Sequence, residues 1–297
     1  MLKHLHAQPR KPARVAVLGA HGFIAGAILR RLMGDSIATI SLGRPSLDLL
    51  KPGASDMLAR ALSGEDCVVF VSAKAPCRDL EMLRQNLAMA QAVCAAIKAK
   101  PVAHVVYISS DAVYKDSTEP LDENSCAEPG SLHGVMHLAR EVALRSEYPG
   151  PLAIVRPTLV YGADDPHNGY GPNRFRRLAM ERKDIVLFGD GEERRDHVDV
   201  ADIAELVRLI VLHRSYGIAN AVSGQVASFR ELAEFVASEF KPRVAIRSGL
   251  RSGPMPHNGY RPFDNRAVLK AFPAFQFKSW REGLSALHRQ LKAEDKR

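Results

Sequence analysis

Two histidines four residues apart, His133 and His137, stand in the stretch SLHGVMHLARE, whose pattern is typical of a helix. Side chains at this spacing lie one turn apart on the same helix face. Imidazole has a pKa of about 6.5, so either ring can exchange a proton near neutral pH. The stretch therefore predicts acid–base chemistry or hydrogen bonding to a ligand.

Two other uses of these residues are disfavoured by their surroundings. Glu141 continues the spacing, so the three side chains form a candidate metal site, but Gly134 stands where an H-E-x-x-H zinc helix needs its glutamate. Ser110 could instead be a nucleophile with His133 as its base. The strained G-x-S-x-G turn that such a serine requires is missing around it.

The elements that position these residues follow a regular alternation. From Arg14 onward, short β-branched runs such as RVAVLGA and HVVYISS alternate with helical patterns such as GFIAGAILRRLM. This order predicts a parallel sheet with helices on both faces, and the nearly continuous apolar runs agree, since parallel strands are buried on both sides. We expect an α/β, Rossmann-type doubly wound sheet with a smaller C-terminal substrate lobe.

The amino-acid composition of the chain changes after Tyr161, where GADDPHNGYGPN is rich in Gly, Pro and Asn. We expect a basic extension over residues 1–13 and a dinucleotide-binding domain over 14–165, to which about 190–222 returns. Residues 166–189 and 223–297 would form the substrate lobe.

The composition argues for a soluble, cytoplasmic protein with no membrane segment, because no window holds about 18 uninterrupted apolar residues. The net charge is +8, but 41 Lys and Arg are spread among 33 acids, so nucleic-acid binding is not expected. The four cysteines form no C-x-x-C pair, which disfavours a disulfide framework or a thiolate zinc site.

A glycine-rich turn joins the first strand to the first helix in VLGAHGFIAG. Gly19 and Gly22 stand where the backbone must turn tightly and approach a pyrophosphate, and the helix N-terminus supplies free N–H groups. At the end of the second strand, SLGRPSLD places Arg44 where NAD-binding proteins carry an acid. This favours NADP(H) over NAD(H), with Asp48 available to the adenine amino group.

Six motifs in order carry a family resemblance: GAHGFIAG, YISSDAVY, RPTLVYG, GPNRF, FGDGEERRDHVDVADIA and FDNRAVLK. With them the chain resembles the extended short-chain dehydrogenase/reductase family. It is most similar to the NAD(P)-dependent epimerase/dehydratase branch that acts on nucleotide sugars. The resemblance covers about residues 14–284 and implies a small-molecule nucleotide-sugar substrate and a cytoplasmic homodimer.

The resemblance assigns roles to the opening stretch. Ser110 matches the serine or threonine that hydrogen-bonds the reacting oxygen. His133 takes the place of the tyrosine that exchanges a proton with the substrate, and His137 that of the lysine that holds the cofactor ribose. Two further departures are Ala25 in place of the third loop glycine and Ala112 in place of a dehydratase glutamate, which disfavours 4,6-dehydration.

The resemblance also implies ligand positions on both lobes. Further cofactor-binding positions are Phe23, Ile24, Ala73 and Pro157. Substrate-binding positions are Asp111, Asn173, Phe175, Arg195 and Arg261. The two arginines would grip the diphosphate, since guanidinium forks match phosphate oxygens. Lys74, after a strand whose end faces the cofactor, is a candidate for the missing cation.

We therefore expect an NAD(P)-dependent oxidoreductase or epimerase of nucleotide-diphosphate sugars. Ser110 would polarise the oxygen, His133 would act as acid and base, and His137 would orient the ribose. The alternative is a catalytically silent dinucleotide-binding sensor of the same fold, because the tyrosine and the lysine are both replaced. The base, the sugar and the reacting carbon stay open.

Overall fold

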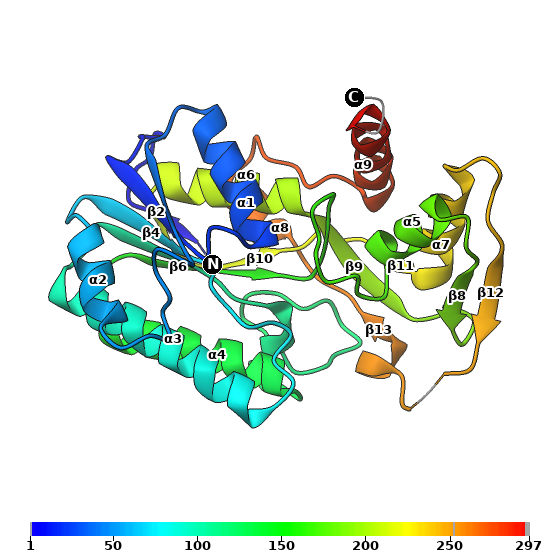
Figure 1. The fold of residues 1–297 in the computed structure, drawn as a ribbon, viewed down its shortest axis with the longest axis horizontal. Helices are drawn as coiled ribbons and strands as arrows, with labels where there is room; N and C mark the ends of the chain where they lie inside the picture. The colour runs from blue at the N-terminus through cyan, green and yellow to red at the C-terminus, as the bar shows by residue number, and fades with distance from the viewer. Residues whose placement is uncertain (1, 252, 295–297) are drawn as a thin grey trace.

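Residues 2–251 and 253–294 are described by the structure, a computed structural model, and form two lobes (Figure 1). The larger lobe holds a seven-stranded sheet in the order β1-β10-β6-β5-β4-β2-β3. Its strands are β1 Lys3–His4, β2 Arg14–Leu18, β3 Thr39–Leu42, β4 Asp66–Phe70, β5 His104–Ile108, β6 Leu152–Pro157 and β10 Ser215–Ala221. Every neighbouring pair is parallel except β1 with β10. The predicted Rossmann-type fold is confirmed.

Alternate residues of β2 show why this sheet needs helices on both faces. Val15 and Val17 belong to the apolar core on one side and Ala16 and Leu18 to that on the other, and all four are fully buried. The helices are α1 Phe23–Gly34, α6 Val200–Leu212 and α8 Arg266–Ala271 for the first core, and α2 Ala54–Ala61, α3 Leu80–Ala99 and α4 Leu132–Glu147 for the second. Figure 1 shows α1 with α6 above the sheet and α3 with α4 below it.

The smaller lobe is built on two short sheets. One contains β7 Leu159–Tyr161, β9 Arg194–Asp199, β11 Val226–Ser228 and β13 Tyr260–Arg261; the other pairs β8 Ile185–Phe188 with β12 Ile246–Gly249. The helices of this lobe are α5 Pro172–Met180, α7 Phe229–Ser238 and α9 Trp280–Glu294. Short 3-10 turns are η1 Asp111–Val113 and η2 Pro256–Gly259. A core of its own, centred on Phe175, Phe229 and Trp280, holds the lobe together.

Two strands do not lie in the parts of the fold that the predicted domain boundaries give them. Strand β1, inside the predicted N-terminal extension, adds an antiparallel strand to the edge of the large sheet. Strand β9, inside the segment predicted to return to the large lobe, pairs instead with β7, β11 and β13 of the small lobe. The rest of that segment, α6 and β10, does pack in the large lobe.

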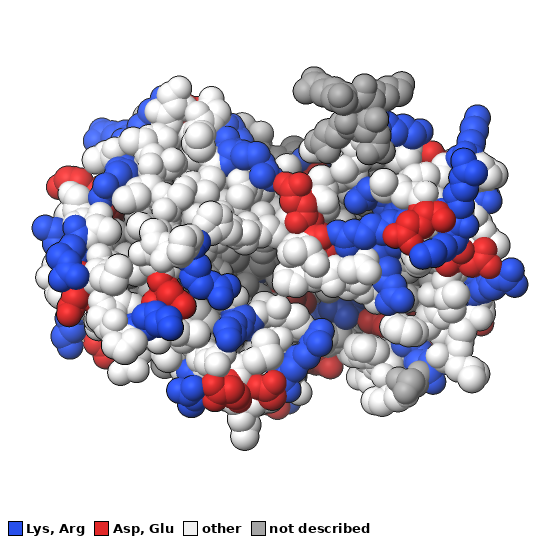
Figure 2. Space-filling view, in the orientation of Figure 1, with Lys and Arg blue, Asp and Glu red and all other residues white. Residues whose placement is uncertain are grey.

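The surface mixes charges of both signs over the face drawn in Figure 2, and a hollow separates the two lobes there. Interspersed charge of this kind is typical of a solvated surface and not of the continuous basic track that binds nucleic acid. Within the described residues, no helix combines the length and the apolar character needed to cross a bilayer.

Candidate cofactor and active site

The turn between β2 and α1 leaves the helix N-terminus uncovered. Gly19 has a positive φ of 89°, and a Cβ there would lie 2.9 Å from the backbone nitrogen of Ser72 on the neighbouring strand end. Gly22, the N-cap of α1, offers no side chain to cap the helix, and the first turn carries no acid. The first N–H groups of α1 and its positive dipole end are therefore available to an anion such as a pyrophosphate.

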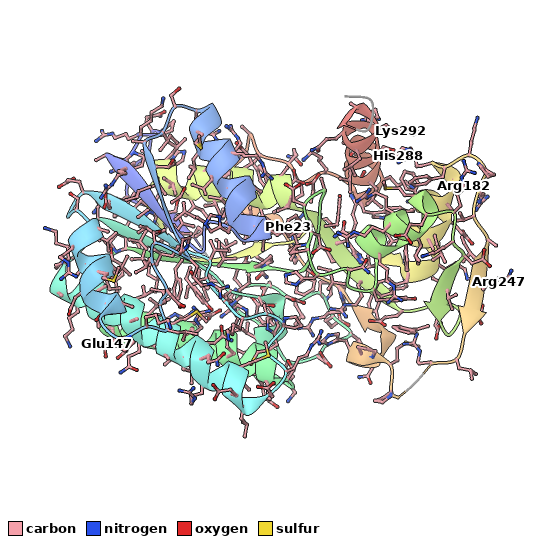
Figure 3. The ribbon with its side chains drawn as sticks, viewed as in Figure 1. Phe23, Glu147, Arg182, Arg247, His288 and Lys292 are labelled. Atoms are coloured by element: carbon pink, nitrogen blue, oxygen red, sulfur yellow. The ribbon has the colours of Figure 1, made fainter. Side chains whose placement is uncertain are left out.

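A cavity of about 850 Å³ begins at this turn and runs between the lobes. Nine of the predicted site residues line it: Gly19, Gly22, Phe23, Ile24, Arg44, Asp48, Ala73, His133 and Asn173. Figure 3 shows Phe23 at the end of α1 that faces the second lobe. The cavity is large enough for a ligand of dinucleotide class and continues along the wall formed by Leu159 and Tyr170.

One end of the cavity carries the residues predicted to select the cofactor. Arg44 follows β3, is exposed, and makes no ion pair with any described residue. Asp48 uses one carboxylate oxygen to accept from the backbone N–H of Leu50 at 3.0 Å. Lys74, after β4, lines the same cavity, and its backbone N–H donates to Asn86 Oδ1 at 2.9 Å. Arg44 and Lys74 thus place two cationic residues in the wall of this cavity.

His133 lies near the start of α4, held there by a close approach of two elements. The Ser131 side chain caps the helix by accepting from the N–H of Gly134 at 3.2 Å. Any side chain at Gly134 would collide with the backbone carbonyl of Ala112 in η1, so only glycine lets α4 pack this tightly. This packing brings the start of α4 against the loop that follows β5.

His133 lines the cavity, and Nδ1 of its ring accepts a hydrogen bond. The backbone N–H of Cys77 donates to Nδ1 over 3.4 Å, a long contact. Burial lowers the pKa of His133 below its usual value, and the charge of Asp111 partly opposes this shift. A neutral ring whose Nδ1 accepts a hydrogen bond carries its proton on Nε2.

His137 lies one turn further and one layer deeper. It is buried, and Nδ1 and the Oη of Tyr107 are joined by a hydrogen bond of 2.7 Å. Its ring contacts that of His133 edge to face, with 4.7 Å between centroids. Burial, then the charges of His133 and Arg140, lower the pKa of His137 well below the usual value. His137, the residue predicted to take the lysine position, is therefore neutral, and it is not part of the cavity wall.

Ser110 lies two residues after the end of β5 and Pro157 is the last residue of β6, and neither is part of the cavity wall. The Oγ of Ser110 accepts from the N–H of Ala112 at 3.1 Å and donates to Asp111 at 3.3 Å. Glu141, the third member of the candidate metal spacing, accepts two hydrogen bonds from Arg156 at 2.9 and 2.6 Å. That carboxylate is thus committed to a buried ion pair.

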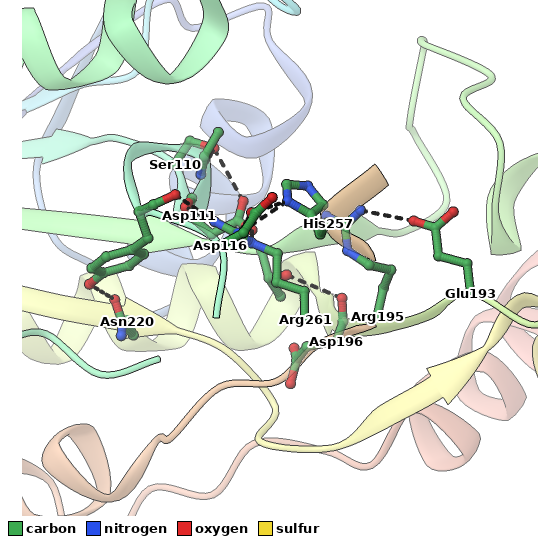
Figure 4. A network of polar contacts seen from close by, with 12 residues as sticks. Ser110, Asp111, Asp116, Glu193, Arg195, Asp196, Asn220, His257 and Arg261 are labelled. Carbon is green, nitrogen blue, oxygen red and sulfur yellow. Dashed lines mark hydrogen bonds and ion pairs between the residues drawn. The ribbon is translucent and has the colours of Figure 1, made fainter. Parts of the chain in front are cut away.

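Arg261 is surrounded by acceptors of its own chain (Figure 4). The side chain is completely buried; Nε donates to Asp111 Oδ2 at 3.1 Å, and Nη1 donates to Asp116 at 2.5 Å. Nη2 donates to the backbone oxygens of Asp111 at 2.7 Å and Tyr114 at 3.3 Å. The prediction that Arg261 and Asp111 face the substrate is not supported, because contact with a diphosphate would first require these bonds to break.

The other small-lobe positions differ from one another. Arg195 pairs with Glu193 at 3.2 Å (Figure 4), and Phe175 is buried against the ring of Tyr170, so neither reaches the cavity. Asn173 does line it, while its amide donates to Asp165 at 2.9 Å. Of the predicted substrate positions, Asn173 is the one in the cavity wall.

Sequence reasoning missed three residues around this site. They are Tyr107, Arg140 and His197. Tyr107 is hidden in an apolar strand pattern, and Arg140 continues the histidine face of α4, which was the available signal. His197 lines the cavity, and burial lowers its pKa to about 3; Nδ1 donates to the backbone oxygen of Arg195 at 3.2 Å.

A family profile, NAD dependent epimerase/dehydratase, matches residues 15–222, which are most of the chain. The chain belongs to this family. A dTDP-L-rhamnose 4-epimerase of Burkholderia thailandensis is 30% identical over 151 residues, which are 48% of this chain and 40% of that protein. The chain thus matches less than half the length of this curated relative.

Solved structures share the family's fold over nearly the whole chain. MoeE5 in complex with UDP-glucose and NAD has a TM-score of 0.80 and 22% identity, over 95% of this chain and 99% of that one. A GDP-L-fucose synthetase of Naegleria fowleri bound to NADP has a TM-score of 0.81 and 15% identity, over 99% and 98%. Proteins of low sequence identity therefore share this architecture.

Proposed function

We propose that the chain binds NADP(H) in the cavity and transfers hydride at a sugar carbon of a nucleotide-diphosphate hexose, by keto-sugar reduction or epimerisation. The observation that carries the proposal is the uncapped N-terminus of α1 behind Gly19 and Gly22, which opens into the cavity. Arg44, exposed and without an ion pair among the described residues, favours the 2′-phosphate of NADP(H). Relatives in the family that bind NAD or NADP support a nicotinamide cofactor.

His133 is the acid–base group in this proposal, since its ring lines the cavity. For reduction it must be protonated on both nitrogens before it can give a proton to the carbonyl oxygen. The Nδ1 proton would displace the long contact from Cys77 N–H, which costs little at 3.4 Å. Because the pKa of His133 is lowered, we expect reduction to quicken as the pH falls below neutrality. Ser110 would contact the substrate only after leaving Asp111, and His137 would hold the ribose only after a rearrangement that brings its ring to the cavity wall.

A fluorescence titration with NADPH and NADH tests the cofactor half of the proposal, and turnover of keto-sugar nucleotides tests the chemistry. His133→Ala should abolish turnover yet leave NADPH affinity within about twofold, since it removes an acid and not a phosphate contact. Unchanged turnover in that variant would refute the role of His133. Failure of both nucleotides to bind would refute the proposal as a whole.

A second candidate is a dinucleotide-binding protein without catalysis, and one observation favours it. Arg261 and Asp111, the predicted substrate contacts, are bonded to each other and lie outside the cavity. Stoichiometric binding of NADPH without hydride transfer to any keto-sugar nucleotide would identify this second function.

A further inference from the structure

A fully buried cation lies behind the two histidines. Arg140 follows His137 on the same face of α4, and its Nη2 donates to the backbone oxygen of Ser72 at 2.7 Å. The guanidinium lies 4.2 Å from the ring centroid of Phe70 and 5.3 Å from that of Tyr107. Within the described part of the chain no carboxylate pairs with it. Its charge therefore acts on the neighbouring dipoles, and the phenol of Tyr107 is one of them.

The charge of Arg140 sets the direction of the Tyr107 hydroxyl. A guanidinium donates but cannot accept, so it attracts the lone pairs of the phenol oxygen and turns the hydroxyl proton away. The hydrogen-bond partner of this hydroxyl is Nδ1 of His137, 2.7 Å from the oxygen. Burial raises the pKa of Tyr107 to about 12, so the phenol keeps its proton. Tyr107 is thus the donor in this hydrogen bond and His137 the acceptor.

An imidazole that accepts at Nδ1 and remains neutral carries its proton on Nε2. We propose that Tyr107 and Arg140 are positioning residues that hold His137 as a neutral ring with a fixed Nε2–H donor. The cationic lysine of the family is then replaced by a neutral donor at position 137 and a buried permanent charge at position 140. The claim that this Nε2–H group binds the ribose rests on the proposed function. The claim that the proton is held on Nε2 does not depend on it.

Nuclear magnetic resonance of the full chain labelled with ¹⁵N-histidine tests the proton position directly. The chain has eleven histidines, and the signals of His137 are identified by their loss in His137→Gln. We expect Nδ1 unprotonated and Nε2 protonated at neutral pH, and a mixture of the two forms in Tyr107→Phe. A proton on Nδ1 in the unaltered protein would overturn the proposal without any variant.

Tyr148→Phe is the matched control, because it removes another buried hydroxyl, which donates to the backbone oxygen of Val102 at 3.0 Å. Its loss should leave the His137 signals unchanged. Unchanged signals in Tyr107→Phe, or equal changes in both variants, would refute a specific role for Tyr107. Arg140→Lys keeps the positive charge and should preserve the Nε2–H form of His137 better than Arg140→Met does. Equal His137 signals in these two variants would refute the role of the charge.

NADPH affinity provides the second readout. Tyr107→Phe should weaken binding by about fivefold, as expected for one misdirected hydrogen bond, while Tyr148→Phe should change it by less than twofold. Equal losses in the two variants would indicate general destabilisation and overturn the positioning role. If NADPH fails to bind the unaltered protein while His137 still shows the fixed Nε2–H, the proposed function fails and the inference about Tyr107 and Arg140 stands.

Discussion

One arginine of the large lobe and one of the small lobe are held in opposite ways. Arg44, beside the glycine-rich turn of the large lobe, is exposed and makes no ion pair with any described residue. Arg261, in the small lobe, is completely buried and donates to both Asp111 and Asp116. A guanidinium whose donors are already used has little to offer a ligand, whereas a solvated one can exchange water for phosphate oxygens.

In a chain with many arginines, this difference distinguishes an arginine that is free to bind a ligand from one that stabilises the fold. The large lobe presents the N–H groups at the start of α1 and the guanidinium of Arg44, unpaired among the described residues, at the cavity, whereas Arg195 and Arg261 of the small lobe are paired with carboxylates and lie outside the cavity wall. Four changes test the contrast, from the largest expected effect to the smallest.

Arg261→Met should lower the free energy of unfolding by about 4 kcal/mol, because it leaves the buried Asp111 without its cation. NADPH affinity should stay within about twofold, since Arg261 lies outside the cavity. Denaturant unfolding measures the first effect and fluorescence titration the second. Arg266→Met is the control: its pair with Asp264 is exposed to solvent, so its loss should leave the free energy of unfolding nearly unchanged. A stable Arg261→Met protein with weakened nucleotide-sugar binding would make Arg261 a ligand contact after all.

Gly19→Val should weaken NADPH binding by at least about 100-fold, or roughly 2.7 kcal/mol. Valine is strained at a φ of 89°, and its Cβ would collide with the Ser72 backbone, so the turn must shift away from the phosphates. Gly34→Ala, at the other end of α1 with no atom within 4 Å of the new Cβ, serves as the control. Full affinity in Gly19→Val would show that the turn does not bind the cofactor.

His104 is a buried histidine of the large lobe that stays neutral, and it forms no ion pair with any described residue. Burial lowers its pKa to about 4, and its Nε2 lies 2.7 Å from the backbone oxygen of Ser215. Because this pKa is below the unfolded value of about 6.5, the stabilisation is present above pH 6.5 and is lost as the pH falls toward 4. Between pH 7 and 5 the unaltered protein should lose about 2 kcal/mol more than His104→Gln in denaturant unfolding. Equal losses of stability between pH 7 and 5 in the two proteins would contradict the assignment of this pH dependence to His104.

Arg44→Ala should weaken NADPH binding by about tenfold, or roughly 1.4 kcal/mol, and leave NADH binding within about twofold, because NADH carries no 2′-phosphate. The paired titrations measure this ratio. Arg60→Ala, which removes an exposed arginine on α2, is the control and should change neither affinity. Equal losses for both nucleotides would assign Arg44 to the pyrophosphate and remove the support for NADP(H).

The features of this protein that depend on short stretches of chain could be predicted from the sequence. The alternation of apolar strands and helices predicts the parallel sheet, since every residue of β4 and β5 is buried. The turn after β2 and the arginine after β3 are each adjacent to their strand, so their meeting at one edge of the sheet follows from parallel pairing. The spacing of His133 and His137 likewise predicts the shared face of α4.

Contacts between distant segments could not be predicted in this way. Asp111 and Arg261 are 150 residues apart, and nothing in either motif shows that they bond to each other. The same is true of the hydrogen bond between Tyr107 and His137, which joins a strand to a helix. By itself the sequence determined the parallel sheet, the glycine-rich turn and the helix face that His133 and His137 share, because these depend on local pattern and spacing. Only the tertiary structure decided which charges are free and which are paired, because burial and hydrogen bonding depend on residues that the chain brings together from far apart.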